Sequence, residues 1–187
     1  LSFKEKVLAS FFQAVVPRTA GYYSVNIGAL YDTTVFLMII LMFIGGSPGS
    51  TAGGIKTTTF GAIALTTISI IKGEKDVVVF KKRISDEIIN RSLAIVSVGI
   101  LLVVLVSFIL TITEGAVFLD ILFETTSAFA TVGLTRGITP YLSNFGKIII
   151  TLTMYAGRVG PLTMAFAFGN KKTHMKYRYS EGNILVG

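Results

Sequence analysis

The sequence has no cysteine among its 187 residues, and charged residues are scarce. Without cysteine the chain cannot hold a disulfide framework, a thiolate zinc site or a catalytic thiol. Charged side chains make up 14% of the residues, about half of the quarter usual in soluble proteins, whereas apolar side chains make up 52%. The sequence also shows no nucleophile–base constellation and no paired carboxylates at a common site. We therefore expect a membrane protein that is not an enzyme.

Three apolar stretches, residues 30–71, 88–113 and 141–169, are each long enough to cross a bilayer, which takes about 20 helical residues. Basic residues follow the first and the third stretch: they are Lys72, Lys75, Lys81, Lys82, Arg83 and Arg91, then Lys171, Lys172, Lys176 and Arg178. Residues 23–32 and 113–119 contain no lysine or arginine. Because lysine and arginine accumulate on the cytoplasmic side of membranes, we expect a multi-pass protein of the cell inner (cytoplasmic) membrane. The basic clusters are then cytoplasmic, and a nucleic-acid partner is not expected.

This orientation makes residues 88–113 run outward and residues 141–169 run inward. Residues 116–130 lie between them and are too few for two full crossings. A short helix that enters the membrane and returns as extended chain fits this stretch, provided that protein or a water-filled path covers it. The sequence therefore predicts a re-entrant pore loop here.

The same plan occurs earlier in the chain, because Thr19 and Gly21 match Thr131 and Gly133 at an offset of 112 (133 − 21). Three further pairs share this offset: Phe11 with Phe123, Met42 with Met154, and Gly45 with Gly157. We predict an all-α membrane protein of repeated helix–pore-loop–helix units around a central pore. Residues 1–80 form one unit that lacks its first helix, residues 81–170 form a complete unit, and residues 171–187 form a cytoplasmic tail.

Both Thr-x-Gly turns are candidates for an ion-selectivity filter. A dehydrated alkali cation needs several oxygen ligands at once, and backbone carbonyls supply them where glycine allows unusual backbone angles. The candidate ligands are Thr19, Ala20, Gly21 and Tyr22 in the first turn, and Thr131, Val132, Gly133 and Leu134 in the second. An ordinary loop glycine explains either turn alone, but two copies in register favour the filter.

The apolar stretch 30–71 would be about 63 Å long as one helix, too long for a single crossing. Its centre, residues 45–56, contains Pro48 and five glycines, which a helix accommodates only at a cost. We predict helix, intramembrane loop and helix. Two full crossings are less favoured, because they would place residues 23–32 in the cytoplasm. Glycines at positions 45, 49 and 53 leave simple helix packing as the other reading of this loop.

Four segments carry a family resemblance: AVVPRTAGYYSVNIGAL, GGSPGSTAGGIKTTT, FETTSAFATVGLTRG and MYAGRVGPLT. They resemble the C-terminal half of potassium transporters of the Ktr, Trk and HKT type, most of all the KtrB-like pore subunits. The resemblance implies four unequal repeats around one pore, of which this chain carries the third and fourth. The chain begins without methionine or a signal-peptide pattern, so we expect an N-terminal part to be missing.

The resemblance also assigns the remaining site residues. It implies a gate made by the intramembrane loop: Gly45, Gly46, Ser47, Pro48, Gly49, Ser50, Thr51, Ala52, Gly53, Gly54 and Lys56. Arg158 lies in an apolar stretch, where an arginine is costly unless it faces protein or water, and we expect it to hold this loop closed. Lys56 acts with the gate or simply extends to the membrane surface. Arg18 and Glu124 brace the filters or serve as ordinary caps.

The expected function is a pore-forming subunit for potassium uptake. It would transport K⁺, with Na⁺ as a further transported or coupling ion, and need no covalent cofactor. The resemblance implies a homodimer on a cytoplasmic ring of KtrA-like nucleotide-binding regulatory subunits. The alternative is a secondary ion transporter, where broken helices also bind ions near the midplane of the membrane. That class would be distinguished by an inverted repeat, whereas this repeat is parallel.

Overall fold

The computed structural model describes residues 2–74 and 76–160, which are mostly helical, as predicted. In chain order the elements are α1 (Phe3–Val15), the 3-10 turn η1 (Ile27–Ala29), α2 (Asp32–Phe43), α3 (Thr57–Ile71), β1 (Val78–Val79), β2 (Lys82–Arg83), α4 (Asp86–Thr113), α5 (Phe118–Ala130), the 3-10 turn η2 (Thr139–Tyr141) and α6 (Asn144–Val159). The short strands β1 and β2 pair antiparallel and form a hairpin between α3 and α4. The predicted tail, residues 171–187, lies outside the described residues.

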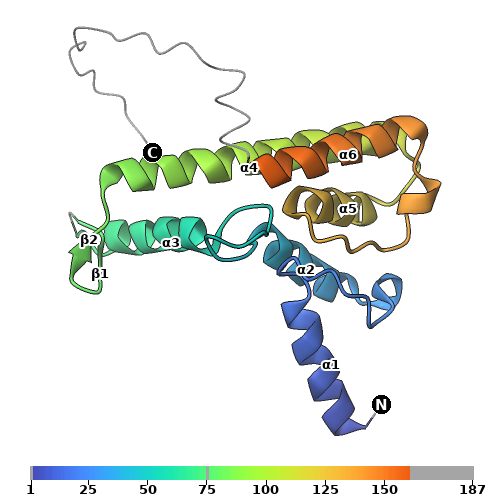
Figure 1. Ribbon diagram of the computed structural model, residues 1–187, viewed down its shortest axis with the longest axis horizontal. Helices are drawn as coiled ribbons and strands as arrows, with labels where there is room; N and C mark the ends of the chain where they lie inside the picture. The colour runs from blue at the N-terminus through green and yellow to red at the C-terminus, as the bar shows by residue number, and fades with distance from the viewer. Residues whose placement is uncertain (1, 75, 161–187) are drawn as a thin grey trace, which may run out of the picture.

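The long helix α4 runs along the long axis of the structure (Figure 1). Its 28 residues span about 42 Å at 1.5 Å per residue, and its most apolar window has a mean hydropathy of 3.1. Among the described residues it is the helix whose length and composition suit a full membrane crossing, while α2 and α3 are shorter apolar helices. The acidic residues Asp86 and Glu87 lie in its first turn, where the helix dipole favours negative charge.

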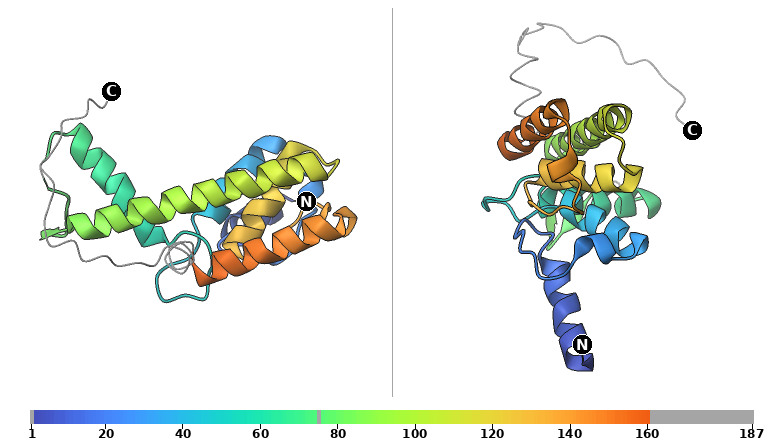
Figure 2. Two further views of the ribbon diagram at one scale, coloured as in Figure 1. Left: turned by 90° about the horizontal axis from the view of Figure 1, so that it is seen from above. Right: turned by 90° about the vertical axis from the view of Figure 1, so that its right-hand side faces the viewer.

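Helix α5 lies at the centre of the helix packing. It contacts α2, α4 and α6, and nine of its residues are buried. Figure 2 shows α4 and α6 side by side over α5. By contrast, α1 projects away from the other helices and buries none of its residues, although Val16 and Pro17, just after it, are fully buried (Figure 1). The two short helices that precede the Thr-x-Gly turns therefore sit in very different surroundings.

The predicted break in the apolar stretch 30–71 is confirmed. Helix α2 ends at Phe43 and α3 begins at Thr57, and the loop between them is closed by a parallel backbone bridge between Ile44 and Ile55. The N–H of Gly45 donates to the carbonyl of Ile55 at 2.8 Å, and that of Thr57 donates to Gly46 at 3.2 Å. These bonds satisfy part of the backbone that leaves the helices, as a loop at membrane depth requires.

The expected inward helix over residues 141–169 is corrected at its start, and residues 161–169 lie outside the described residues. Helix α6 begins at Asn144, because the Ser143 hydroxyl caps it by accepting from the Gly146 N–H. It ends at Val159, because Gly160 has a φ of 98°, in a region that ordinary residues rarely adopt. Arg158 lies in the last turn of α6.

The two chain segments repeat their elements at one spacing. The 3-10 turns begin at residues 27 and 139, and the helices that follow begin at residues 32 and 144, so both pairs are 112 residues apart. The two units thus share the order short helix, turn, 3-10 turn and helix. Only the second unit has a preceding long helix, α4, within the described residues.

Candidate functional site

The two Thr-x-Gly turns have the same unusual backbone. Thr19 and Gly21 both have φ of 68°, and Thr131 and Gly133 have φ of 56° and 86°. The residue between each pair has negative φ, so the sign alternates along both turns. The two turns therefore share a left-handed conformation at both the threonine and the glycine.

A threonine with left-handed φ is rare, because its branched side chain crowds the backbone. At Thr131 the end of α5 helps to hold this conformation: the Thr131 N–H donates to Ala128 at 3.0 Å and the Val132 N–H donates to Ser127 at 2.9 Å. This pair of bonds is the Schellman arrangement that closes many helices, usually with glycine in the left-handed position. Backbone strain of this kind costs about 1–3 kcal/mol and concentrates at functional sites.

The two turns lie against each other. A Cβ atom on Gly21 would overlap the carbonyl oxygen of Val132, so the first turn packs directly on the backbone of the second. Val132 and Leu134 are buried, whereas Gly133 is exposed with nothing within 4 Å of a Cβ placed there. Tyr22 is exposed. The structure therefore brings together the predicted filter residues of both units.

The loop between α2 and α3 reaches the base of the second turn. The Gly53 N–H donates to Thr131 Oγ1 at 3.0 Å. A Cβ on Gly53 would lie 2.9 Å from the carbonyl oxygen of Ala130, and one on Gly54 would lie 3.3 Å from the Ala130 Cα. Glycine is needed here because the loop backbone touches the turn, and Gly54 also has a φ of 67°.

The loop buries its ends and exposes its tip. Gly45, Gly53, Gly54 and Ile55 are buried, whereas Ser47, Pro48, Gly49, Ser50 and Thr51 are exposed, and Gly46, Ala52 and Lys56 are half-buried. The aromatic rings of Phe43 and Phe129 stack at a centroid distance of 5.8 Å next to the buried end. Helix ends and the base of the loop are thus packed together, while the tip is free of packing within the described part of the chain.

Three basic side chains donate to carbonyl groups of this loop. Arg18 Nη1 donates to Ile44 at 3.1 Å and to Gly45 at 3.4 Å. Lys56 Nζ donates to Ala52 at 2.5 Å and to Ser50 at 3.4 Å. Arg158 Nη1 donates to the carbonyl oxygen of Thr51, at the tip of the loop, from the last turn of α6.

Behind the second turn lies a buried acid, Glu124. Its Oε1 accepts from the Thr139 hydroxyl at 2.5 Å, and Thr139 Oγ1 lies 2.8 Å from Thr135 Oγ1. The second carboxylate oxygen of Glu124 is buried without a partner among the described residues. Glu124 thus links α5 to the segment that follows the turn, a bracing contact of the kind proposed for it.

A second carboxylate, Glu114, joins α4 to α6 at the opposite end from the β-hairpin. It accepts from the Ser143 N–H at 2.9 Å and from the Ser143 hydroxyl at 2.6 Å. These hydrogen bonds, with a smaller contribution from nearby Lys147, hold the pKa of the Glu114 carboxyl below its usual range. Sequence reasoning missed this contact, as it missed the ion pairs of Arg136 with Asp32 and Asp120.

One cavity of about 550 Å³ lies between α2, α4 and the loop. Its lining includes Phe36, Phe43, Ile55 and Val103 and is almost wholly apolar. An alkali cation needs oxygen ligands, so this cavity is not the ion site.

A long apolar helix, two glycine turns that lie against each other and a broken helix in contact with the second turn are the features of a helical membrane protein. Comparison with known sequences agrees: residues 1–177 match the TrkH family, described as cation transport proteins. The chain belongs to this family, which is one of transporters and not of enzymes.

Individual relatives carry the names of potassium or potassium/sodium uptake proteins. The chain is 46% identical over 183 residues to the Ktr system potassium uptake protein B of Bacillus subtilis, which covers 98% of this chain and 41% of the relative. It is 40% identical over 186 residues to the Ktr system potassium uptake protein D of the same organism, covering 100% of this chain and 41% of the relative. It is 39% identical over 194 residues to the potassium/sodium uptake protein NtpJ of Enterococcus hirae, covering 100% of this chain and 43% of the relative. The chain thus spans about two-fifths of the length of these relatives.

Proposed function

We propose that this chain forms part of the pore of a potassium uptake protein in the cytoplasmic membrane, and that residues 19–22 and 131–134 are two segments of its selectivity filter. The observation that carries the proposal is the shared backbone of the two turns, with alternating φ sign at positions 112 residues apart. Their contact at Gly21 and Val132 supports the proposal, because the two turns lie against each other. The printed names of the relatives, which include a potassium/sodium uptake protein, favour K⁺ as the transported ion and admit Na⁺.

The loop at residues 45–56 acts in this proposal as the gate. It lies directly under the second filter segment, through the contact of Gly53 with Thr131, and its tip is held by Arg158. Small residues at the buried end allow the loop backbone to approach the filter, and the unpacked tip can move without disturbing the helix core. Removing the Arg158 contact therefore favours the open pore.

The assembly belongs to the proposal as well. The Ktr names of the relatives indicate a system of several components. The pore subunit would form a homodimer and bind a KtrA-like ring of nucleotide-binding regulatory subunits through the basic β1–β2 hairpin and the tail at residues 171–187. The hairpin and the Glu114 contact lie at opposite ends of α4, so a cytoplasmic hairpin places Glu114 on the outer side (Figure 1).

The filter assignment is tested by replacing one glycine in the full protein reconstituted in lipid vesicles. Gly133→Ser is the better probe, because Gly133 has open space for a side chain, whereas any side chain on Gly21 collides with Val132. Gly73→Ser is the matched control: Gly73 has a φ of 72° and equal open space, but lies in the turn after α3.

We expect Gly133→Ser to lower the preference for K⁺ over Na⁺ in Rb⁺ uptake competition, and Gly73→Ser to leave it unchanged. Both variants bear a similar backbone strain of about 1–3 kcal/mol. A difference in K⁺-over-Na⁺ preference between them is therefore due to the position of the substitution and not to strain. An unchanged preference in well-folded Gly133→Ser protein would refute the filter assignment.

A further inference from the structure

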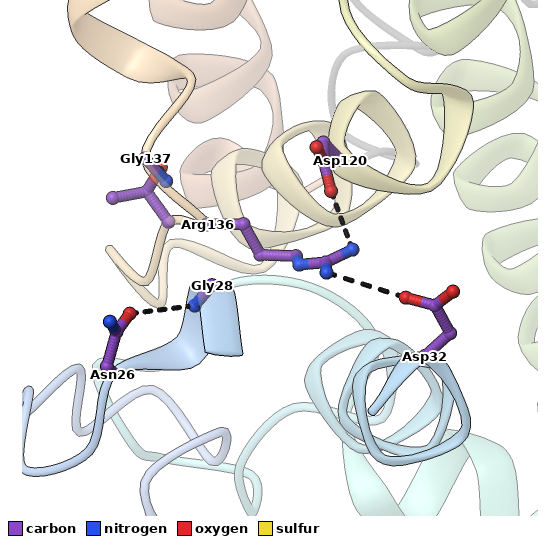
Figure 3. A network of polar contacts seen from close by, with 7 residues as sticks. Asn26, Gly28, Asp32, Asp120, Arg136 and Gly137 are labelled. Atoms are coloured by element: carbon purple, nitrogen blue, oxygen red, sulfur yellow. Dashed lines mark hydrogen bonds and ion pairs between the residues drawn. The ribbon is translucent and has the colours of Figure 1, made fainter. Parts of the chain in front are cut away.

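Arg136 lies three residues after Gly133, where the second Thr-x-Gly segment leaves the filter region, and its side chain is only 12% exposed. Its Nη1 pairs with Asp120 Oδ1 at 2.6 Å, and its Nη2 pairs with Asp32 Oδ1 at 3.4 Å. Figure 3 shows the guanidinium group between the two carboxylates. Asp120 lies in the first turn of α5, and Asp32 lies in the first turn of α2. One side chain thus joins the two repeat units.

The backbone of Arg136 makes a second contact with the first unit. A Cβ on Gly28 would lie 3.3 Å from the Arg136 carbonyl oxygen, which is tighter than ordinary packing. Gly28 is itself held by its N–H, which donates to Asn26 Oδ1 at 3.1 Å (Figure 3). The outer loop of the first unit and the exit of the second filter segment are therefore packed against each other at this residue.

We propose that Arg136 is a positioning residue that holds the outer end of the second filter segment against the start of α5, the short helix of its own unit, and thereby sets ion discrimination. The inference rests on the proposed function, since it takes residues 131–134 as filter. Ion discrimination by carbonyl groups depends on how many oxygens surround the ion and how firmly they are held. Leu134, two residues before Arg136, is buried, so a shift of Arg136 moves the filter backbone and not a loose loop.

The two carboxylates do not contribute equally. The Asp120 side chain is 23% exposed, whereas that of Asp32 is 78% exposed. A solvent-exposed ion pair contributes little, while loss of one partner from a buried pair leaves an uncompensated charge. The Asp120 pair therefore carries most of the positioning. Lysine cannot replace arginine fully, because a single ammonium group lacks the planar fork that reaches both carboxylates.

The test measures inhibition of Rb⁺ uptake by Na⁺ and by K⁺ in vesicles that contain the full protein. We expect Arg136→Gln and Asp120→Asn each to lower the K⁺-over-Na⁺ preference by about three- to tenfold, within the range of couplings in one polar network. The double variant, Arg136→Gln with Asp120→Asn, is expected to have a K⁺-over-Na⁺ preference no lower than that of either single variant. Asp32→Asn should stay near the parent value, and Arg136→Lys should be intermediate.

Arg91→Gln is the control. Arg91 is exposed and lies near the start of α4, outside the hairpin and away from both Thr-x-Gly turns in the sequence. Loss of its charge should not move the ion preference. The thermal unfolding midpoint of every variant is measured in detergent, so that a loss of fold is seen separately from a loss of preference.

An unchanged preference in Arg136→Gln, beside a changed preference in Gly133→Ser, overturns the role of Arg136 and leaves the filter assignment standing. An unchanged preference in both overturns the proposed function. If Arg136→Gln does not fold, Asp120→Asn and Arg136→Lys decide the question, and parent-like preference in both overturns the inference. Additive effects in the double variant also overturn it, because they show that the two residues do not act through their contact.

Discussion

Arg158→Gln is expected to raise the rate of cation flux through the pore. Arg158 extends from the last turn of α6 to the carbonyl oxygen of Thr51 at the tip of the loop. This contact joins residues that are 107 positions apart in the sequence, whereas the other charged side chain on the tip, Lys56, comes from the end of the loop itself. Glutamine keeps much of the length and the capacity to donate, but it removes the charge.

The magnitude follows from the type of bond. A hydrogen bond from a charged donor contributes about 1.5–3 kcal/mol when it is buried, and exposed pairs contribute roughly 0.2–1 kcal/mol. Arg158 is exposed and its partner is a loop carbonyl, so about 0.5–1.5 kcal/mol is a reasonable range for the lost contact. Because 1.4 kcal/mol corresponds to a factor of about ten, the open-to-closed ratio should rise roughly two- to tenfold.

The assay is the initial rate of Rb⁺ uptake into vesicles at saturating ion concentration, with K⁺-over-Na⁺ preference measured in parallel. Lys147→Gln is the control, because Lys147 lies on the same helix and loses the same charge, yet it is not bonded to the loop in the described structure. The rate should rise in Arg158→Gln alone, with the preference unchanged. Equal or lower flux in folded Arg158→Gln protein, or an equal rise in Lys147→Gln, would refute the reasoning.

Two further predictions concern stability in detergent. Gly157→Ala should lower the unfolding midpoint by the equivalent of about 1–3 kcal/mol, because its Cβ would overlap the carbonyl oxygen of Phe129. In the control Gly61→Ala, in α3, the new Cβ meets nothing, so the midpoint should stay the same or rise. Equal midpoints in the two variants would contradict the close contact of α6 with α5. Because its folded pKa is lowered, the Glu114 carboxylate stabilises the fold above its unfolded pKa of about 4.3, and this contribution is lost as pH falls through the folded pKa. The midpoint should therefore lie above that of Glu114→Gln near pH 6 and converge with it in acid, and a gap independent of pH would contradict the ionised contact.

Local features made much of this fold predictable. Glycine and proline break a helix by their own geometry, so the interruption after Phe43 could be read from residues 45–56 alone. The spacing of 112 residues between the turns also separates the starts of the following helices, although Ser143 caps α6 with its side chain and Tyr31 makes no such bond at α2.

The contacts that could not be predicted join residues that are far apart in the sequence and close in space. Arg136 and Asp32 are 104 residues apart, and nothing in either local sequence shows that η1 and the exit of the second turn meet. The hydrogen bonds between Glu114 and Ser143 could not be predicted from local sequence either, because they form only where α6 packs beside α4. The filter role of residues 19–22 and 131–134, the gate and the regulatory partner stay predictions, to be decided by the flux experiments.

The three basic side chains on the loop have one more consequence, which concerns competition between ions. Arg18, Lys56 and Arg158 each place a positive group against carbonyl oxygens of residues 44–52, so these oxygens are already coordinated by cations tethered to the protein. If residues 19–22 and 131–134 form the filter, as proposed, a potassium ion that leaves them would meet ligands of the right chemistry that are occupied by a fixed charge. Passage through this region would then be an exchange reaction, in which mobile and tethered cations compete for the same oxygens. The concentration of permeant ion would itself shift the loop toward release.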